Sequence, residues 1–338
     1  MERRHFIIGA VAGGIGLFQY AFFTGWMKQL SQTRPRLRVR DYLSLGENAA
    51  LAAITPVPDF YCVQKGLPEY IKEQAWKLRI DGLVRQPAQF TLAAIRDMPA
   101  VERVITLECV ENRIGGPLIG NAKWKGVRLA DLLASAGVEP RAHYAAFHGN
   151  DRFSTGHPLD RVVSPDVILA YEMNGAPLTA SHGFPLRLLV PGKFGMKQTK
   201  WLTRIELLDK HYVGYWEERG WSDACERAVH ARFDAPDEIA HLKGNSFVLA
   251  GYALGGRSGV KGVELSLDAG KTWATADLFS NPSTEAWSFW RYAWSPAPGQ
   301  YEVRVRAISG AGEVQTEGPV RPFPDGATGQ EVVKVEVV

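Results

Sequence analysis

A single cysteine, Cys109, lies where an apolar run gives way to a segment rich in glycine. The run before it contains Val104, Ile105 and Leu107, and the chain-breaking residues after it are Gly115, Gly116, Pro117 and Gly120. We therefore expect a strand to end near Cys109 and a loop to present the thiol at its mouth. A thiolate is a soft metal ligand and a good nucleophile. A buried structural cysteine is the alternative, and this stretch alone leaves both interpretations open.

A second group of reactive side chains lies between residues 181 and 201, in a frame broken by glycine and proline. Its basic members are His182, Arg187, Lys197 and Lys200, with little acidic compensation. Arginine and lysine on such a backbone suit a phosphate or another polyanion. A solvated basic loop is the alternative. Arg187 argues against it, because this residue stands between two leucines in a strand-like run and its charge then needs a partner.

The elements that position these residues are mixed, without a regular β-α alternation. We expect strands at residues 76–80, 90–92, 101–107 and 167–171, and helices at 92–98 and 127–136. Asn174-Gly175 predicts a turn. The chain has no G-x-G-x-x-G motif, so a dinucleotide-binding Rossmann domain is not supported.

The last hundred residues, 236–338, have the pattern of an all-β domain. Apolar and polar residues alternate over 263–268, 301–307 and 333–337, and Asp268-Ala269-Gly270 predicts a turn. Short strands with frequent turns are typical of an antiparallel sandwich. Nothing in this region looks catalytic, and a sugar-binding or adhesion role is the alternative to a role in assembly.

Length and composition exclude several classes of protein. A chain of 338 residues favours two domains, and 46% hydrophobic residues are enough for real cores. The net charge of +3 is too small to indicate nucleic-acid binding. The three cysteines, Cys62, Cys109 and Cys225, lie far apart and form no C-x-x-C, which argues against a zinc site and a disulfide framework.

The N-terminus resembles an export signal. Arg3-Arg4 precedes an uncharged stretch from residue 6 to 27, the arrangement of a twin-arginine signal, and 28–55 has the character of a linker. The stretch is long enough to span a bilayer and shows no clear A-x-A cleavage site. An uncleaved transmembrane anchor and a cleaved signal both remain open. Either way, we expect the protein on the periplasmic side of the cytoplasmic membrane.

An ordered set of motifs over residues 56–338 resembles the sulfite oxidase family of molybdopterin enzymes. The set consists of Cys109 with Asn112-Arg113, then Gly120-Asn121-Ala122-x-Trp124-x-Gly126, Ala170-Tyr171-Glu172-Met173-Asn174-Gly175, His182-Gly183-Phe184-Pro185-Leu186-Arg187, and Gly195 with Lys200-Trp201-Leu202. The resemblance implies an α+β fold. Residues 56–235 would form a sulfite-oxidase-type molybdopterin-binding domain, and 236–338 an immunoglobulin-like sandwich that makes a homodimer.

The resemblance also implies a site. Cys109 would ligate the molybdenum of a molybdenum-molybdopterin cofactor, with Arg113 and Trp221 as further catalytic residues. The implied cofactor-binding residues are Phe60, Tyr61, Cys62, Asn112, Asp151, His182, Arg187, Lys197, Gln198, Thr199 and Lys200. No C-x-x-C-H haem motif is present. Electrons would therefore pass to a separate partner, a cytochrome or a membrane haem subunit.

Two departures from the family pattern concern the substrate. Sulfite oxidases have an arginine shortly after the first aromatic pair, where this chain has Cys62-Val63-Gln64-Lys65, and an active-site tyrosine where it has Trp221. We therefore expect an oxygen-atom transfer enzyme with weak sulfite oxidation and a less charged substrate, such as an S-oxide or N-oxide. The alternatives are a periplasmic sulfoxide or N-oxide reductase of the same superfamily, whose methionine-sulfoxide branch lacks the C-terminal domain, and a non-catalytic membrane-tethered interaction module.

Overall fold

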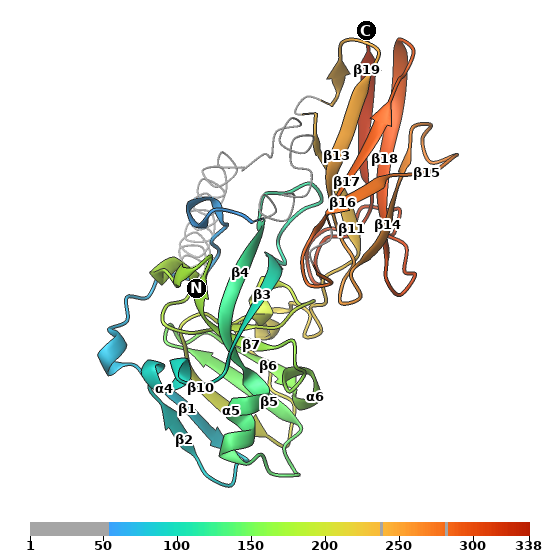
Figure 1. The fold of residues 1–338 in the computed structure, drawn as a ribbon. Coiled ribbons are helices and arrows are strands. Elements are labelled where there is room, and N and C mark those ends of the chain that lie inside the picture. The colour runs from blue at the N-terminus through green and yellow to red at the C-terminus, as the bar shows by residue number, and fades with distance from the viewer. Residues whose placement is uncertain (1–53, 237–238, 281–282) are drawn as a thin grey trace, which may run out of the picture. The chain divides into compact units, whose positions relative to one another are not determined.

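A computed structural model describes residues 54–236, 239–280 and 283–338. These residues form mostly β-structure with few helices (Figure 1). The predicted signal at 1–27 and most of the predicted linker at 28–55 lie outside the described residues. Among the described helices, none has the length and apolar character needed to cross a membrane.

The first sheet has the strand order β2-β1-β10-β5-β6. Strands β1 and β10 run parallel, and the other neighbours are antiparallel. Its strands are β1 (Leu78–Gly82), β2 (Ala88–Phe90), β5 (Tyr144–Gly149), β6 (Ser154–Pro158) and β10 (Leu202–Leu208). The sheet brings β10, which directly follows the Lys200 loop, next to β5, which leads into Asp151.

The second sheet carries Cys109 and Arg187. Its order is β3-β4-β7-β8, with β9 paired to β7. Its strands are β3 (Ala100–Glu108), β4 (Ile119–Arg128), β7 (Ile168–Met173), β8 (Ala176–Pro177) and β9 (Arg187–Leu189). Strand β3 ends one residue before Cys109, as the apolar run predicts, and β9 begins at Arg187.

Three short α-helices lie among these strands: α4 (Leu92–Arg96), α5 (Leu129–Ala136) and α6 (Leu159–Val162). Helix α4 starts at Thr91, whose hydroxyl accepts a bond from the Ala94 amide at 3.2 Å. Helix α5 ends at Gly137, which has a φ of +67°. Its buried face packs against Leu78, Ile80 and Phe147 of the first sheet, so the helices close one common core.

The structure corrects three details of the predicted elements. The predicted glycine-rich loop behind Cys109 is strand β4 from Ile119 onward, because β3 supplies a full antiparallel partner. Val127 and Arg128 belong to that strand, and the predicted helix at 127–136 starts only at Leu129. The predicted strand at 76–80 starts at Leu78, because Trp76 ends a short 3-10 helix, η3 (Glu73–Ala75).

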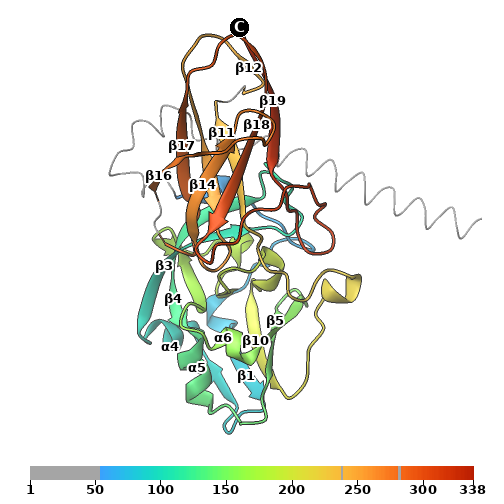
Figure 2. The same ribbon diagram turned by 90° about the vertical axis from the view of Figure 1, so that its right-hand side faces the viewer.

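The C-terminal part consists of two sheets, as the alternating pattern predicts. One has the order β11-β13-β17-β16, with strands His230–Ala235, Phe247–Leu254, Ser288–Trp294 and Asp277–Ser280. The other has the order β12-β19-β18-β14-β15, with strands His241–Leu242, Glu331–Val337, Gly299–Ser309, Val260–Ser266 and Ala274–Thr275. Figure 2 shows their long strands alongside one another. Strand β11 pairs with β13 although it precedes residue 236, the predicted domain boundary, and the boundary itself stays a prediction.

Thr106, near the end of β3, joins the second sheet to the C-terminal sheets. Its amide donates to the Glu285 carbonyl at 3.1 Å, and its hydroxyl accepts from the Trp287 amide at 2.8 Å. Its carbonyl accepts from Arg227 Nη1 at 2.6 Å. The strand that delivers Cys109 is therefore held from the C-terminal side two residues before it ends.

Candidate active site

Cys109 lines an open pocket, whose volume is about 870 Å³ when the solvent space at its mouth is included. Eight of the sequence-predicted site residues line it: Phe60, Tyr61, Cys109, Asp151, Arg187, Gln198, Lys200 and Trp221. They come from residues 60–61, 109, 151, 187, 198, 200 and 221, so the fold gathers distant parts of the chain around one thiol.

The Cys109 thiol is buried at 7% exposure. Burial raises the pKa of this thiol, and the nearby Glu111 carboxylate raises it further. Its amide donates to the Leu118 carbonyl at 2.9 Å, which fixes the first residue after β3. A thiol in this position stays protonated unless a cation binds the sulfur, and a metal ion deprotonates a coordinating thiol outright.

Asn112 holds the loop behind Cys109 in shape. Its side-chain amide donates to Glu108 Oε1 at 2.8 Å, and its oxygen accepts from the Leu118 amide at 3.0 Å. The buried side chain thus closes the loop from 109 to 118 and does not line the pocket. Arg113 is exposed and does not line it either.

Arg187 is a buried cation that donates to a backbone carbonyl. Its side chain is 5% exposed and donates from Nη1 to the His182 carbonyl at 3.1 Å. Its Nε is buried with no hydrogen-bond partner, and the guanidinium lies 5.1 Å from the ring centre of Trp124. Burial lowers the pKa of Arg187 to about 10. Strand β9 therefore presents an incompletely satisfied cation to the pocket.

Lys200 supplies the second cation of the pocket. Its ammonium donates to Gln64 Oε1 at 2.6 Å and to the Ser181 carbonyl at 2.9 Å, and lies 3.8 Å from the sulfur of Cys62. Burial lowers the pKa of Lys200 to about 8. Cys62 itself is half-buried and does not line the pocket.

Of the other predicted cofactor-binding residues, Phe60, Tyr61 and Asp151 line the pocket, and His182 does not. Phe60 packs on Tyr61 with ring centres 5.5 Å apart and meets the ring of His182 at 5.5 Å. Burial, then the charges of Arg187 and Lys200, lower the pKa of His182 to about 4, so this buried imidazole is neutral. Burial also raises the pKa of Asp151, although its carboxylate accepts a bond from the Phe153 amide at 3.0 Å.

The structure places the three residues before Lys200 differently from one another. Gln198 lines the pocket, but its amide is held by the Val190 amide at 3.2 Å and the Lys193 carbonyl at 2.9 Å. Thr199 is fully buried, and its hydroxyl has no hydrogen-bond partner. Lys197 turns away from the pocket lining and pairs with carboxylates of the segment that follows β10.

Sequence reasoning missed several residues that line the pocket. The residues that line the pocket but were not predicted as site residues are Val63, Gln64, Lys65, Leu107, Val110, Glu111, Phe153, Gly195, Met196, Trp201 and Trp216. Val63 and Gln64 entered only as a departure from a family pattern. Trp216 carries no local signal, because only the folded position of residues 216–221 brings it to Cys109.

The residues present fit a molybdenum-molybdopterin cofactor. Arg187 Nε and the Thr199 hydroxyl are buried polar atoms without protein partners, and Arg187 and Lys200 are cations that burial alone disfavours. A phosphate dianion would satisfy such groups. The soft ligand that molybdenum needs is the Cys109 thiolate.

The class that this fold and site define is a thiolate-ligated, molybdopterin-binding oxidoreductase with an additional β-domain. A family model of the oxidoreductase molybdopterin binding domain matches residues 64–216, and one of the Mo-co oxidoreductase dimerisation domain matches 229–323. The chain belongs to the sulfite oxidase family of molybdopterin-dependent oxidoreductases. Its cofactor is molybdenum-molybdopterin.

Individual relatives agree with this assignment. The mitochondrial sulfite oxidase of Drosophila melanogaster is 32% identical, covering 78% of this chain and 55% of the relative. The sulfite oxidase of Arabidopsis thaliana is 28% identical, and the match covers 78% of this chain and 82% of the relative. The chain thus spans a little over half the length of the mitochondrial relatives. The crystal structure of the sulfane dehydrogenase SoxCD from Paracoccus pantotrophus shares the fold, with a TM-score of 0.74, 23% identity and coverage of 85% and 84%.

Proposed function

We propose that this protein is a molybdenum-cofactor-dependent oxidoreductase that transfers an oxygen atom to or from a small substrate. One observation carries the proposal: a buried thiol, Cys109, a buried cation, Arg187, and a half-buried cation, Lys200, line the same pocket. The thiolate is suited to the metal and the cations to the pterin phosphate. The family relationship, with sulfite oxidases and nitrate reductases among the relatives, supports the same class of reaction.

The bound cofactor supplies two-electron oxygen-atom transfer chemistry, and the protein supplies position, charge and exclusion of water. Cys109 would hold the metal at the end of β3. Arg187 and Lys200 would hold the phosphate, with neutral His182 packed against Phe60 beside them. Trp216 and Trp221, from the segment that follows β10, also line the pocket and would restrict the access of water and substrate.

The proposed substrate carries less charge than sulfite. The pocket lining near Cys109 offers Val110, Met196, Trp216 and Trp221, and Val63 stands where sulfite oxidases have a cation. Besides burial, the acids on either side of Cys109, Glu108 and Glu111, both raise the pKa of its thiol. An anion gains least in such surroundings, because charge is strongly felt in a partly dry pocket. We therefore favour an S-oxide or N-oxide, and sulfite as a poor substrate.

The cofactor is tested by elemental analysis and pterin fluorescence of protein from a host that makes molybdopterin. We expect one molybdenum and one pterin per chain, and loss of the metal in Cys109→Ser. Arg187→Ala should lose the pterin as well as turnover, and circular dichroism separates that loss from misfolding. Full molybdenum content in Cys109→Ser with unchanged spectra would contradict the proposal.

The substrate is tested by two assays on molybdenum-loaded protein. One follows sulfite oxidation with an artificial electron acceptor, and the other follows sulfoxide reduction with a reduced dye. We expect the second to be the faster. Fast turnover of sulfite at low KM would show that the argument from Val63 and Trp221 is wrong.

We further propose a periplasmic location, export by the twin-arginine signal, and electron exchange with a cytochrome or membrane haem subunit. The Arg3-Arg4 pair before an uncharged stretch supports the export route. The match to a dimerisation domain supports a homodimer. In cells, Arg3→Lys/Arg4→Lys should accumulate in the cytoplasm, and unchanged export would refute this route. Release of the wild type from membranes by salt alone would argue against an uncleaved anchor.

A further inference from the structure

We infer that Lys197 is a positioning residue, which holds Trp216 and Trp221 in the wall of the Cys109 pocket by bridging Glu217 and Asp223. The ammonium of Lys197 is 1% exposed and pairs with both carboxylates. Trp216 directly precedes Glu217 in the chain, and Trp221 lies between Glu217 and Asp223. An effect of the two tryptophans on substrate selection rests on the proposed function, whereas the ion pairs of Lys197 do not depend on it.

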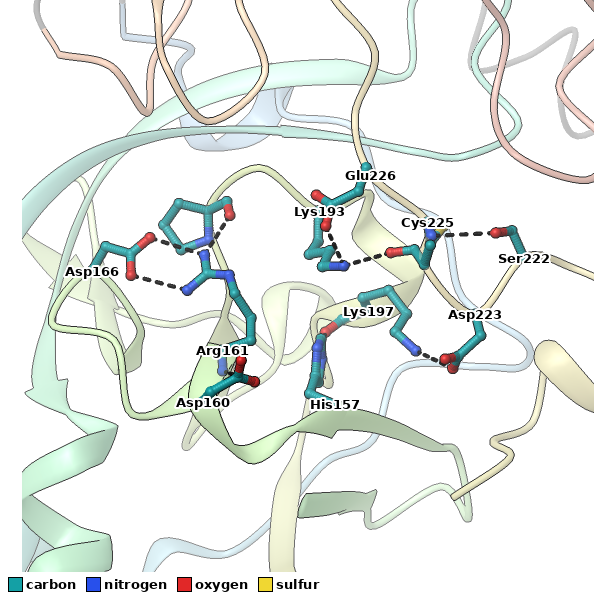
Figure 3. Close-up of polar contacts among 12 residues, drawn as sticks. His157, Asp160, Arg161, Asp166, Lys193, Lys197, Ser222, Asp223, Cys225 and Glu226 are labelled. Carbon is teal, nitrogen blue, oxygen red and sulfur yellow. Dashed lines mark hydrogen bonds and ion pairs between the residues drawn. The ribbon is translucent and has the colours of Figure 1, made fainter. Parts of the chain in front are cut away.

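Lys197 does not line the pocket itself, but its two neighbours in the chain do. It ends a short 3-10 helix, η5 (Gly195–Lys197), and the residues on both sides of it, Met196 and Gln198, line the pocket. Its carbonyl lies 2.8 Å from Nε2 of His157. Burial lowers the pKa of His157 well below its usual range, so the ring is neutral and donates its Nε2 hydrogen to that carbonyl. The base of Lys197 is thereby fixed (Figure 3).

The two carboxylates belong to the segment that carries the tryptophans, residues 214–223. Glu217 follows Trp216 directly, and its carboxylate is 3% exposed. Glu217 Oε1 accepts from Lys197 Nζ at 2.6 Å and from the Thr155 hydroxyl at 2.7 Å. Asp223 comes two residues after Trp221, and Lys197 Nζ donates to its Oδ1 at 3.2 Å. One ammonium therefore bonds to the segment at two points, next to Trp216 and two residues after Trp221.

The pKa of Asp223 agrees with this role. Burial raises the pKa of this carboxyl, but the charges and hydrogen bonds of Lys197 and His211 together lower it below its usual value. Asp223 also accepts from the Tyr144 hydroxyl at 3.2 Å and pairs with His211 at 3.0 Å. Figure 3 shows Lys197 and Asp223 directed toward each other.

Besides the ion pairs, the segment 214–223 is held by packing of its two tryptophans on a buried cluster around Met196 and by backbone bonds to the carbonyls of Ser154 and Pro324. It contains no β-strand, and its short 3-10 helix η6 (Glu217–Arg219) is followed by Gly220 at a φ of +89°. Trp221 meets the ring of Phe323 with centres 5.2 Å apart, but Phe323 is itself 55% exposed. Because the segment has no strand pairing, opening it requires breaking only this packing, these backbone bonds and the ion pairs of Lys197, so loss of the ion pairs should ease its local opening.

Lys197 and Lys200 lie in one basic loop of the sequence but have different roles in the folded protein. Lys200 faces the pocket and would bind the phosphate, whereas Lys197 is occupied by two carboxylates and is not free to bind it. Loss of Lys197 should therefore loosen the tryptophan wall and leave the cofactor in place.

The test is hydrogen–deuterium exchange of the full-length, cofactor-loaded protein, read on peptides that cover 214–223. The variant is Lys197→Met/Glu217→Gln, which removes the buried pair without leaving one charge alone. We expect exchange in this segment to rise by about tenfold or more, with unchanged exchange over β3 and unchanged molybdenum and pterin content. Lys197→Arg keeps the charge and should remain near the wild-type rate.

A matched control removes another buried cation of the same region. Arg161 is 7% exposed and pairs with Asp166 at 2.9 Å, and both lie outside the tryptophan segment (Figure 3). Arg161→Met should leave exchange over 214–223 unchanged. Wild-type exchange in the double variant, an equal rise in the Arg161 control, or loss of the cofactor in the double variant would each overturn the inference.

A second measurement concerns selectivity. The ratio of kcat/KM for methyl phenyl sulfoxide to that for dimethyl sulfoxide should change at least threefold in the double variant, mainly through KM. An unchanged ratio in an active enzyme would show that the segment does not shape the substrate path. If no variant, and not even the wild type, turns over a sulfoxide, the proposed function fails, while the exchange experiment still decides the role of Lys197.

Discussion

Lys200 carries its charge among neutral hydrogen-bond partners. The Gln64 side chain and the Ser181 carbonyl accept its bonds, and burial lowers its pKa to about 8 from a usual 10.5. A lowered pKa means that the folded, cofactor-free protein binds this proton more weakly than the unfolded chain does. The free energy of unfolding then rises with pH between about 8 and 10.5, and the full cost of the buried charge is present below that window.

We predict that the free energy of unfolding of the cofactor-free wild type, measured relative to that of Lys200→Met, increases as the pH rises from 8 to 10. Denaturant unfolding of both proteins at several pH values measures this difference. The cofactor-loaded protein should show a flatter profile, because a bound phosphate dianion favours the charged lysine and raises its pKa. A profile of the cofactor-free wild type that matches Lys200→Met at every pH would contradict the role given to burial.

At this scale, residue type and spacing predicted part of the site. Cys109 at the end of a strand and Arg187 inside one followed from the apolar residues around them, and both line the pocket. The difference between Lys197 and Lys200 did not follow. It depends on the ion pairs of Lys197 with Glu217 and Asp223. These acids lie in the segment after β10, and no local sequence pattern predicts that this segment folds back to Lys197.

At the scale of elements, strand β4 sets the distance between the Cys109 strand and the aromatic residues at the pocket. Gly120 in β4 lies opposite Leu107 of β3. A Cβ at Gly120 would stand 2.8 Å from ring carbons of Phe60. Phe60 has little freedom to move, because its ring packs on Tyr61 and His182 and edge-on to Trp124 at 5.9 Å.

We predict that Gly120→Ala lowers the free energy of unfolding by about 1–3 kcal/mol, the usual cost of an overpacked core. Displacement of Phe60 should also lower the pterin content of purified protein. Gly262→Ala is the matched control, since Gly262 lies in β14 with open space where a Cβ would be. Its effect should stay within about 1 kcal/mol. Equal losses in the two variants would show that backbone freedom, and not Phe60, decides the result.

The same strand shows why the elements were predicted only in part. Periodicity found β3, β7 and the apolar face of α5, because each buries a regular set of residues. The glycines of β4 gave the signal of a loop, yet β3 on one side and β7 on the other supply partners along its length. At Gly126 a Cβ would lie 2.1 Å from the Leu169 carbonyl oxygen, so this glycine permits close strand pairing and does not break it.

At the scale of the whole molecule, the Cys109 strand and the C-terminal sheets are joined by specific bonds. Besides the three bonds of Thr106, Arg103 pairs with Glu285 at 2.7 Å. Burial raises the pKa of Glu285, and the charge of Arg103 opposes that rise. Two regions coupled in this way are expected to unfold together, although large chains with separate cores often do not.

We predict that Thr106→Val lowers the free energy of unfolding by about 1–3 kcal/mol and separates the unfolding of the two regions. The substitution keeps the shape of the side chain and removes the hydroxyl that bonds to the Trp287 amide and to Asn121 Oδ1. Calorimetry should show one transition in the wild type and a broadened or split one in the variant. Thr203→Val is the control, because the Thr203 hydroxyl bonds to the His148 carbonyl within the first sheet. It should lower stability while keeping a single transition, and a split in the control but not in Thr106→Val would show that the coupling lies elsewhere.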